Sequence, residues 1–168
     1  LGKTMIGWGE VGHYENLNPN TIIQLWQSPA KKDHETALKL GVKTIMSPAH
    51  KIYVDMKYDE STHVGQDWAG YVSVETAYNW DPTSVYEGFN EQDILGIEAP
   101  LWTETIHNTE DADYMYFPRI SGVAEIGWSP KNNRSWEEYR LRLARLGQRL
   151  QQLGVNFYRS PLIPWNKS

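Results

Sequence analysis

Residues 93–104 read DILGIEAPLWTE, an apolar, strand-like run that leads into an aromatic side chain and a carboxylate, Trp102 and Glu104. A second pair, Tyr53 and Asp55, follows the apolar run VKTIMS in the same manner. Alternate residues of a strand share a face, so each pair is predicted to present a flat ring and an acid to one space. A pyranose packs its C–H face on an aromatic ring, and its hydroxyls donate hydrogen bonds to ionised carboxylates. The two pairs therefore predict a sugar-binding site.

Strand-like and helical runs alternate along the rest of the chain. Apolar runs rich in β-branched residues predict four strands, at residues 3–8, 21–26, 42–47 and 93–99. A helix is predicted at residues 28–40, where Gly41 stops it, and a short one at residues 73–78 within a long irregular stretch. Two more helices are predicted to end the chain.

This order of elements favours an α/β fold with a parallel sheet. In a (β/α)₈ TIM barrel the functional residues gather at the carboxyl ends of the strands, where the two ring-and-acid pairs are expected. A complete barrel needs about 250 residues. The 168 residues of this chain therefore predict half of a TIM barrel.

The last predicted helix has the clearest signals. Residues 135–138, SWEE, form a capping box, and Gly154 is a stop signal. One apolar stripe follows at helical spacing and is predicted to face the core: Trp136, Tyr139, Leu143, Leu146, Leu150 and Leu153. The arginines of this helix are predicted to form a solvated face: Arg140, Arg142, Arg145 and Arg149.

Composition limits the classes of function. The net charge is −5 and no Lys/Arg cluster lies outside the last helix, which argues against a nucleic-acid partner. No apolar run is long enough for a membrane span, so no membrane partner is expected. The chain has no Cys, its five His show no metal-ligand spacing, and no Gly-rich phosphate loop occurs, so neither a metal nor a cofactor is expected. The chain begins Leu1-Gly2 without Met or a signal segment, so we expect it to be cut from something longer.

Eight short motifs closely resemble those of the β-N-acetylhexosaminidases of glycoside hydrolase family 20, in the family's order. They are IGWGE (6–10), QLW (24–26), SPA (47–49), YVD (53–55), DW (67–68), GIEAPLWTE (96–104), FPRI (117–120) and AEIGW (124–128). The resemblance implies that residues 1–168 are the C-terminal half of the catalytic TIM barrel, about strands five to eight with their helices. It also favours a secreted or periplasmic location.

The resemblance implies a reaction that retains configuration, in which the substrate's own acetamido oxygen is the nucleophile. An Asp-Glu pair at the end of strand four serves this reaction in the family. No pair in a matching context occurs here, because Asp59-Glu60 lies in a polar loop after the strand that corresponds to strand seven. The catalytic pair is therefore expected outside this chain.

By the same resemblance, Trp8, Trp26 and Trp102 wall the acetamido pocket. Tyr53 donates its hydroxyl to the acetamido carbonyl and stabilises the oxazolinium-like intermediate.

Asp55 and Glu104 accept hydrogen bonds from sugar hydroxyls around C4 and C6, and Trp68 borders that edge. The family often has Asp where this chain has Gly9, for which a minor effect is expected. Glu10 is as readily a cap or loop acid as a ligand.

The function implied is a fragment of an exo-acting enzyme that removes terminal β-linked GlcNAc or GalNAc from glycans. The alternative is a non-catalytic glycan-binding or structural relative that retains the sugar pocket. A barrel glycosidase with two protein carboxylates is a third reading, but the hydroxyl-binding positions expected for Asp55 and Glu104 argue against it. The half barrel is expected to associate with itself or with the missing N-terminal half, because its strand edges are open.

Overall fold

The computed structural model describes residues 2–14, 16–29, 31 and 33–165. The chain forms two compact units. Unit 1 comprises Leu1–Ala49 and Trp80–Glu98, and unit 2 comprises His50–Asn79 and Ala99–Ser168.

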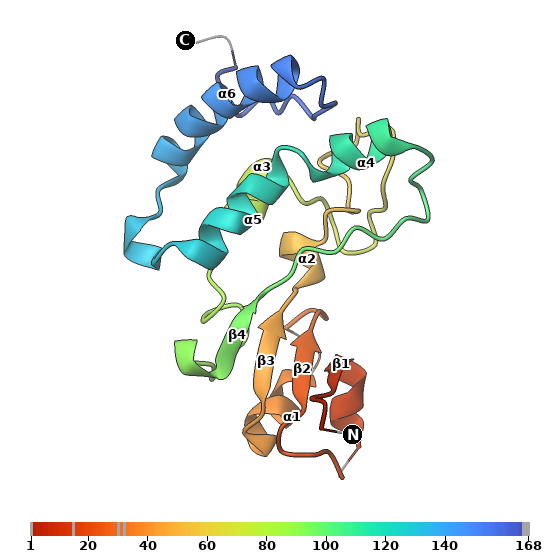
Figure 1. Cartoon of the computed structure of the whole chain (residues 1–168), viewed down its shortest axis with the longest axis vertical. Coiled ribbons are helices and arrows are strands. Elements are labelled where there is room, and N and C mark those ends of the chain that lie inside the picture. Colours follow the sequence, from red (N-terminus) through yellow and green to blue (C-terminus); the bar gives the residue numbers. More distant parts are fainter. Residues whose placement is uncertain (1, 15, 30, 32, 166–168) are drawn as a thin grey trace. The chain divides into compact units, whose positions relative to one another are not determined.

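Unit 1 is built on a four-stranded parallel sheet, as predicted. Its strands lie in chain order and are β1 (Ile6–Trp8), β2 (Ile22–Leu25), β3 (Lys43–Met46) and β4 (Ile94–Ile97) (Figure 1). Every neighbouring pair is parallel, and the register shifts between Thr44 and Ile45 where β3 meets β4. The strands are shorter than the apolar runs that predict them, because the ends of those runs leave the ladder.

Short helices complete unit 1. They are the 3₁₀ helices η1 (Gly9–His13) and η2 (Glu91–Asp93) and the α-helix α1 (Asp33–Leu40), which packs against β2 and η1. The prediction that this helix begins at residue 28 is wrong, since its first residue is Asp33. Gly41 ends it with a φ of +63°, a conformation that glycine adopts without a steric penalty.

Unit 2 is mainly helical. It contains α3 (Val74–Tyr78), α4 (Thr109–Tyr116), α5 (Arg119–Trp128), η3 (Lys131–Asn133) and α6 (Trp136–Gln152), and α2 (Ala49–Ile52) lies where the chain passes from unit 1 to unit 2. Three helices rather than the predicted two follow β4. The additional helix, α4, is capped by Asn108, whose Oδ1 accepts a 2.8 Å hydrogen bond from the amide of Asp111.

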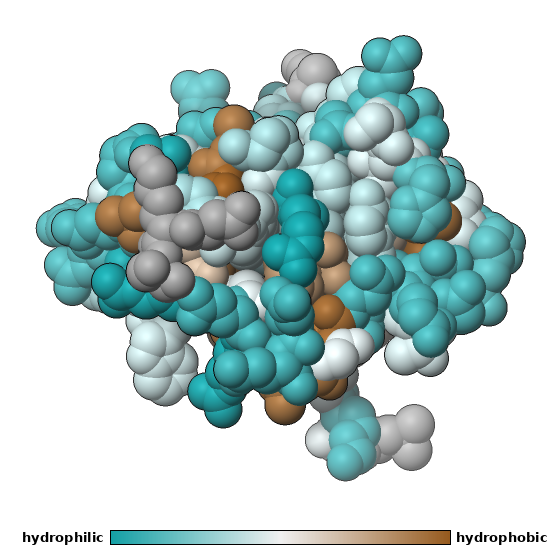
Figure 2. Space-filling model, turned by 90° about the horizontal axis from the view of Figure 1, so that it is seen from above, coloured by the Kyte–Doolittle hydropathy of each residue, from teal (hydrophilic) through white to brown (hydrophobic). Residues whose placement is uncertain are grey.

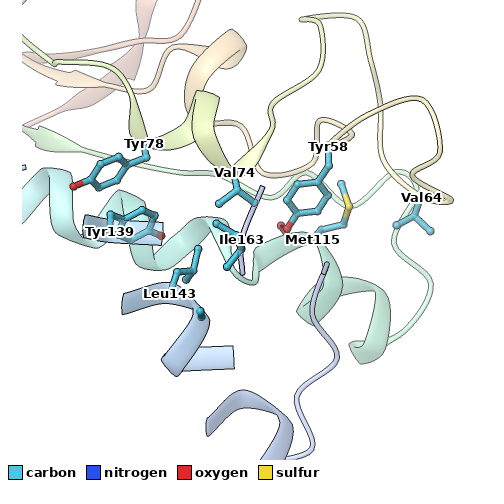
Figure 3. Packing of buried hydrophobic residues seen from close by; sticks show 9 residues of the cluster. Tyr58, Val64, Val74, Tyr78, Met115, Tyr139, Leu143 and Ile163 are labelled. Carbon is cyan, nitrogen blue, oxygen red and sulfur yellow. Dashed lines mark hydrogen bonds between the residues drawn. The ribbon is translucent and has the colours of Figure 1, made fainter. Parts of the chain in front are cut away.

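The core cluster of unit 2 joins α3, α4 and α6. Figure 3 shows Tyr78 of α3 lying against Tyr139 of α6, and their rings stack with centroids 4.1 Å apart. Leu143 and Met115 are buried in the same cluster. Stacked and edge-on rings therefore supply much of the packing here, which accounts for part of the aromatic content of the chain.

The capping and spacing signals of α6 predict most of its structure correctly. Ser135 caps the helix and accepts a hydrogen bond from the amide of Glu138 at 3.4 Å, and Tyr139, Leu143 and Leu150 are buried. Leu153 is 68% exposed, so its assignment to the core is wrong. The helix ends at Gln152, one residue before this leucine.

As predicted, Arg142, Arg145 and Arg149 of α6 are exposed, and Arg140 is half-buried. Arg142 donates to both carboxylate oxygens of Glu125 on α5, at 2.6 and 2.7 Å. A two-point arginine–carboxylate contact has defined geometry, so this side chain helps to hold α6 against α5.

On the face shown in Figure 2, apolar side chains form separate small patches between hydrophilic ones. Within the described parts of the chain, no helix combines the length and apolarity needed to cross a membrane.

Two leucines on α6 test the assigned core. Leu143 is 1% exposed and Leu141 is 51% exposed. Leu143→Ala should lower the free energy of unfolding by about 2–5 kcal/mol, because it leaves a cavity. Leu141→Ala, the matched control, should change it by less than about 0.5 kcal/mol. Urea unfolding followed by circular dichroism measures both, and equal losses would contradict the assigned orientation of α6.

Candidate functional site

Two tryptophan side chains of unit 2 lie against the ring of Tyr53. The Tyr53 ring lies edge-on to Trp68, with centroids 6.0 Å apart, and is tilted against Trp102 at 6.5 Å. Tyr53 is buried, whereas Trp68 is 54% and Trp102 is 41% exposed. A buried ring thus lies between two rings that reach solvent, and exposed aromatic faces are suited to pack against the apolar side of a ligand.

The two ring-and-acid pairs come together, but not through strand alternation. Tyr53 follows α2, and Trp102 lies beyond the end of β4 at Ile97. The prediction that each pair lies on a strand is therefore wrong. A hydrogen bond from the amide of Val54 to the carbonyl of Pro100, 3.0 Å long, joins the two irregular segments.

Asp55 is a fully buried acid beside these rings. Within the described residues, neither carboxylate oxygen has a hydrogen-bond partner of acceptable geometry. The pKa of Asp55 is raised to about 6, mainly by burial and also by the charge of Glu104. The amides of Asp55 and Trp102 and the charge of Arg119 lower it by less. The structure therefore holds a buried acceptor that can still accept hydrogen bonds.

Glu104, the acid of the second pair, is exposed, and its charge acts on Asp55. The structure thus brings together Tyr53, Asp55, Trp68, Trp102 and Glu104 in unit 2. Two carboxylates and three rings can accept hydrogen bonds from hydroxyls and pack against C–H groups, which are the two properties that a sugar presents.

The other two predicted residues, Trp8 and Trp26, belong to unit 1. Trp8 is the last residue of β1, and Trp26 directly follows β2; both are half-buried. The indole Nε1 of Trp26 donates to Glu10, at 3.1 Å from Oε1 and 3.2 Å from Oε2. Gln27 donates to the same carboxylate at 3.1 Å.

These bonds explain the role of Glu10 within unit 1. Burial alone would raise the pKa of Glu10, but hydrogen bonds from its own amide, from Trp26 and from Gln27 lower it overall. Glu10 lies in η1 and acts as the acid that orients the Trp26 indole.

Gly9, next to it, is buried. A Cβ at this position would lie 3.4 Å from Oδ2 of Asp33. An aspartate here would bring a second carboxylate close to that of Asp33.

Sequence reasoning missed a polar network at the strand ends of unit 1. The buried Gln24 side chain donates from Nε2 to Ser47 Oγ and to Glu98 Oε1, both at 2.9 Å. These residues lie on or just after β2, β3 and β4. A polar residue within an otherwise apolar strand, as in IIQLW, was the available signal, since a buried amide needs partners.

Asp59 is engaged in hydrogen bonds of its own loop. The Asp59 carboxylate accepts from the amide of Ser61 at 2.9 Å and from its hydroxyl at 2.6 Å, and it also accepts from the hydroxyl of Tyr158. These bonds lower the pKa of Asp59. These bonds hold the turn at residues 59–62.

Comparisons with known proteins agree with the geometry. The family profile described as glycosyl hydrolase family 20, catalytic domain, matches residues 1–131. A β-N-acetylhexosaminidase of Cellulomonas fimi is 33% identical over 165 residues, which is 98% of this chain and 33% of that protein. The GH20 β-N-acetylhexosaminidase structure from Streptomyces coelicolor A3(2) has a TM-score of 0.92 and 40% identity, covering 98% of this chain and 34% of that one.

A mutant Streptomyces plicatus β-hexosaminidase in complex with its product GlcNAc has a TM-score of 0.90 and 39% identity, over 98% of this chain and 34% of that one. The chain therefore spans about a third of the length of these relatives. The likeness and the parallel sheet identify the TIM-barrel class of fold. The match over residues 1–131 shows that the chain belongs to glycosyl hydrolase family 20.

Proposed function

We propose that this chain is part of an exo-acting β-N-acetylhexosaminidase that hydrolyses terminal β-linked GlcNAc or GalNAc. The observation that carries the proposal is the grouping of Trp68 and Trp102 around Tyr53, with the buried acid Asp55 near the amide of Trp102, in a member of family 20. The S. plicatus relative in complex with GlcNAc supports an amino sugar as the ligand class.

We propose that the reaction retains configuration and that the substrate's acetamido oxygen is the nucleophile. Tyr53 would donate its hydroxyl to the acetamido carbonyl, which holds that oxygen for attack and stabilises the charge that develops. Trp102 would shield the same group from water, which favours attack by the acetamido oxygen over attack by solvent. Trp8 and Trp26 are proposed as further sugar-binding residues of unit 1.

Asp55 and Glu104 are proposed to accept hydrogen bonds from hydroxyls around C4 and C6. The unused oxygens of Asp55 support this role, because a sugar hydroxyl would supply the bond that a buried carboxylate lacks. Trp68 is proposed to border that side of the sugar, since it lies edge-on to Tyr53 and reaches solvent.

The general acid/base is proposed to lie outside this chain, in an Asp-Glu pair of a longer protein. The engagement of Asp59 in its turn and the coverage of about a third of the relatives support this assignment. The chain would then be the C-terminal half of the catalytic barrel.

Within the described residues β1 pairs only with β2 and β4 only with β3, and Ile6 and Leu95 on these edge strands are each 56% exposed. Such strand edges would pair with the N-terminal half of the barrel or with a second copy of this chain.

A non-catalytic glycan-binding relative is the second candidate, because the grouping of rings and acids serves binding as well as catalysis. The parent gene distinguishes the two: an Asp-Glu pair at the end of a strand before residue 1 supports the hydrolase, and its absence supports the binding protein.

Ring substitutions test the proposal in the longer protein that we propose contains this chain. Tyr53→Phe should lower kcat on the order of 100-fold, with a smaller change in KM, because its hydroxyl acts on developing charge. Trp102→Ala should cost about 2–4 kcal/mol of transition-state stabilisation. Trp128, 91% exposed at the end of α5, provides the matched control: Trp128→Ala should leave hydrolysis of an aryl N-acetylglucosaminide unchanged. Parental turnover by Tyr53→Phe would remove its hydroxyl from the mechanism.

Substrate preference tests the two acids. GlcNAc and GalNAc differ at C4, so replacing Asp55 or Glu104 by Ala should change the ratio of the two kcat/KM values. A hydrogen bond lost at a buried polar group typically costs about 1–3 kcal/mol. Paired assays with aryl GlcNAc and aryl GalNAc substrates measure the ratio, and an unchanged ratio in both variants would place these acids outside the site.

The pKa of Asp55, about 6 in the folded protein, predicts opposite effects of pH on stability and binding. An acid whose pKa is raised by folding destabilises the fold once it ionises, so stability should fall as pH rises from about 4 to about 6. Asp55→Asn should therefore be more stable than the parent at pH 7.5, by about 1–3 kcal/mol, with little difference at pH 4. GlcNAc affinity of the parent should fall below about pH 6, since the ionised acid is the better acceptor. Urea unfolding measures the stabilities, and titration calorimetry measures the affinity. If the parent and Asp55→Asn were equally stable at pH 7.5 and at pH 4, the burial of an ionised Asp55 would be contradicted.

A further inference from the structure

Arg119, the first residue of α5, is fully buried, and all of its hydrogen bonds within the described residues go to main-chain carbonyls or to a methionine sulfur. Nη1 donates to the carbonyls of Met56 at 2.6 Å and Val72 at 2.9 Å. Nη2 donates to Val54 at 2.6 Å and Met115 at 2.8 Å, and Nε donates to Met115 at 3.3 Å. A guanidinium has five N–H groups in a fixed plane, so these bonds use its whole donor set.

A ring fixes the plane of this guanidinium. The Arg119 Cζ atom lies 3.7 Å from the centroid of the Tyr58 ring, a cation–π contact inside the core. Tyr58 stacks on Tyr158, with ring centroids 3.9 Å apart, and the single O–H of Tyr58 lies within donor distance of the carbonyls of Tyr114, Met115 and Phe117, at 2.9, 3.1 and 3.0 Å. Figure 3 shows Tyr58 beside Met115 in the buried cluster. The direction of the Arg119 donors is therefore set by packing.

Two of the bonded carbonyls flank Asp55. Val54 precedes it and Met56 follows it, so Arg119 holds the carbonyl of the residue on each side of the acid. The carbonyl of Asp55 itself accepts from the amide of Gln66 at 2.8 Å. Three consecutive carbonyls are thus held from outside the segment, and the Val54 amide ties the segment to Pro100, two residues before Trp102.

A buried cation is a costly way to fill a core. Replacing a buried charge by a well-packed apolar side chain of similar volume often leaves stability unchanged or raises it. An apolar residue cannot hold four carbonyls of three chain segments in one plane. The bonds of Arg119 therefore specify the path of the backbone more than they add stability.

We propose that Arg119 is a positioning residue for the sugar site: by holding the carbonyls of Val54 and Met56 it sets the direction in which Tyr53 and Asp55 face the substrate. The inference rests on the proposed sugar-binding roles of those two residues. Arg119 does not contact the substrate and acts through the main chain of residues 53–56.

Arg119→Lys tests the proposal in the 168-residue chain, because lysine keeps the charge but has no planar fork. The amide of Lys57 donates to the carbonyl of Gln66, and the amide of Gln66 donates to the carbonyl of Asp55. In the variant, both amides should exchange with deuterium about tenfold faster relative to α6 amides, because this part of the chain opens locally. The carboxyl titration of Asp55, followed by ¹³C NMR, should shift, because the carbonyls of Val54 and Met56 are no longer held in place and the surroundings of the carboxyl group change. The affinity of the folded protein for N-acetylglucosamine should fall on the order of tenfold.

Leu143→Ala is the matched control for loss of stability alone. It removes packing from the same core without touching residues 53–56, so it should leave the relative exchange rates, the Asp55 titration and the sugar affinity of the folded protein at parental values. If Arg119→Lys behaves like Leu143→Ala in all three measurements, Arg119 is only a core residue and the proposal is overturned. If the parent chain binds no sugar while exchange and titration still respond to Arg119→Lys, the assigned sugar-binding roles of Tyr53 and Asp55 in this chain fail and the positioning of residues 53–56 by Arg119 stands.

A measurement on the unmodified chain covers the case in which Arg119→Lys does not fold. If Arg119 holds this segment, the Lys57 and Gln66 amides should exchange only when the whole of unit 2 unfolds, with the same denaturant dependence as buried amides of α6. Exchange of these two amides through a local opening that does not depend on denaturant would overturn the proposal.

Discussion

The backbone that carries the site has no regular secondary structure, so its buried amides and carbonyls must find partners outside the segment. A sheet or helix satisfies such groups internally, whereas a buried loop depends on distant residues. Here the partners are the Arg119 guanidinium and the Pro100 carbonyl, which hold the residues on either side of Asp55. The geometry of the rings and acids therefore depends on a residue of α5, more than 60 positions along the chain from Tyr53.

Unit 1 meets the same requirement differently. Its sheet satisfies the main chain, and polar side chains at the carboxyl ends of the strands then fix the side chains that follow. Gln24 bonds to Ser47 and Glu98 across three strands, and Glu10 holds the indole of Trp26. A polar side chain is useful at such a point because its hydrogen bonds have direction, which apolar packing alone does not impose.

The sequence predicts regular elements better than the path of the site loop. The four strands follow from runs of β-branched residues, and α6 follows from its cap and its spacing. The apolar run into Tyr53 resembles one strand, but β3 ends before Pro48 and a short helix intervenes, as expected where proline cannot donate to a ladder. Local patterns also gave no reason to place Arg119 in the core, since its partners are carbonyls that every residue possesses.

The same carbonyl contacts explain how Asp55 can be both buried and available. A cation placed in direct contact with this acid would satisfy its oxygens and remove them from ligand binding. Arg119 instead lowers the pKa of Asp55 through its charge while its N–H groups bond to the main chain. Within the described residues the carboxylate gains electrostatic support and keeps its acceptor capacity. A buried acid arranged in this way costs stability in the absence of ligand, and a hydroxyl that donates to it relieves that cost, so the instability of the empty site becomes part of the driving force for binding.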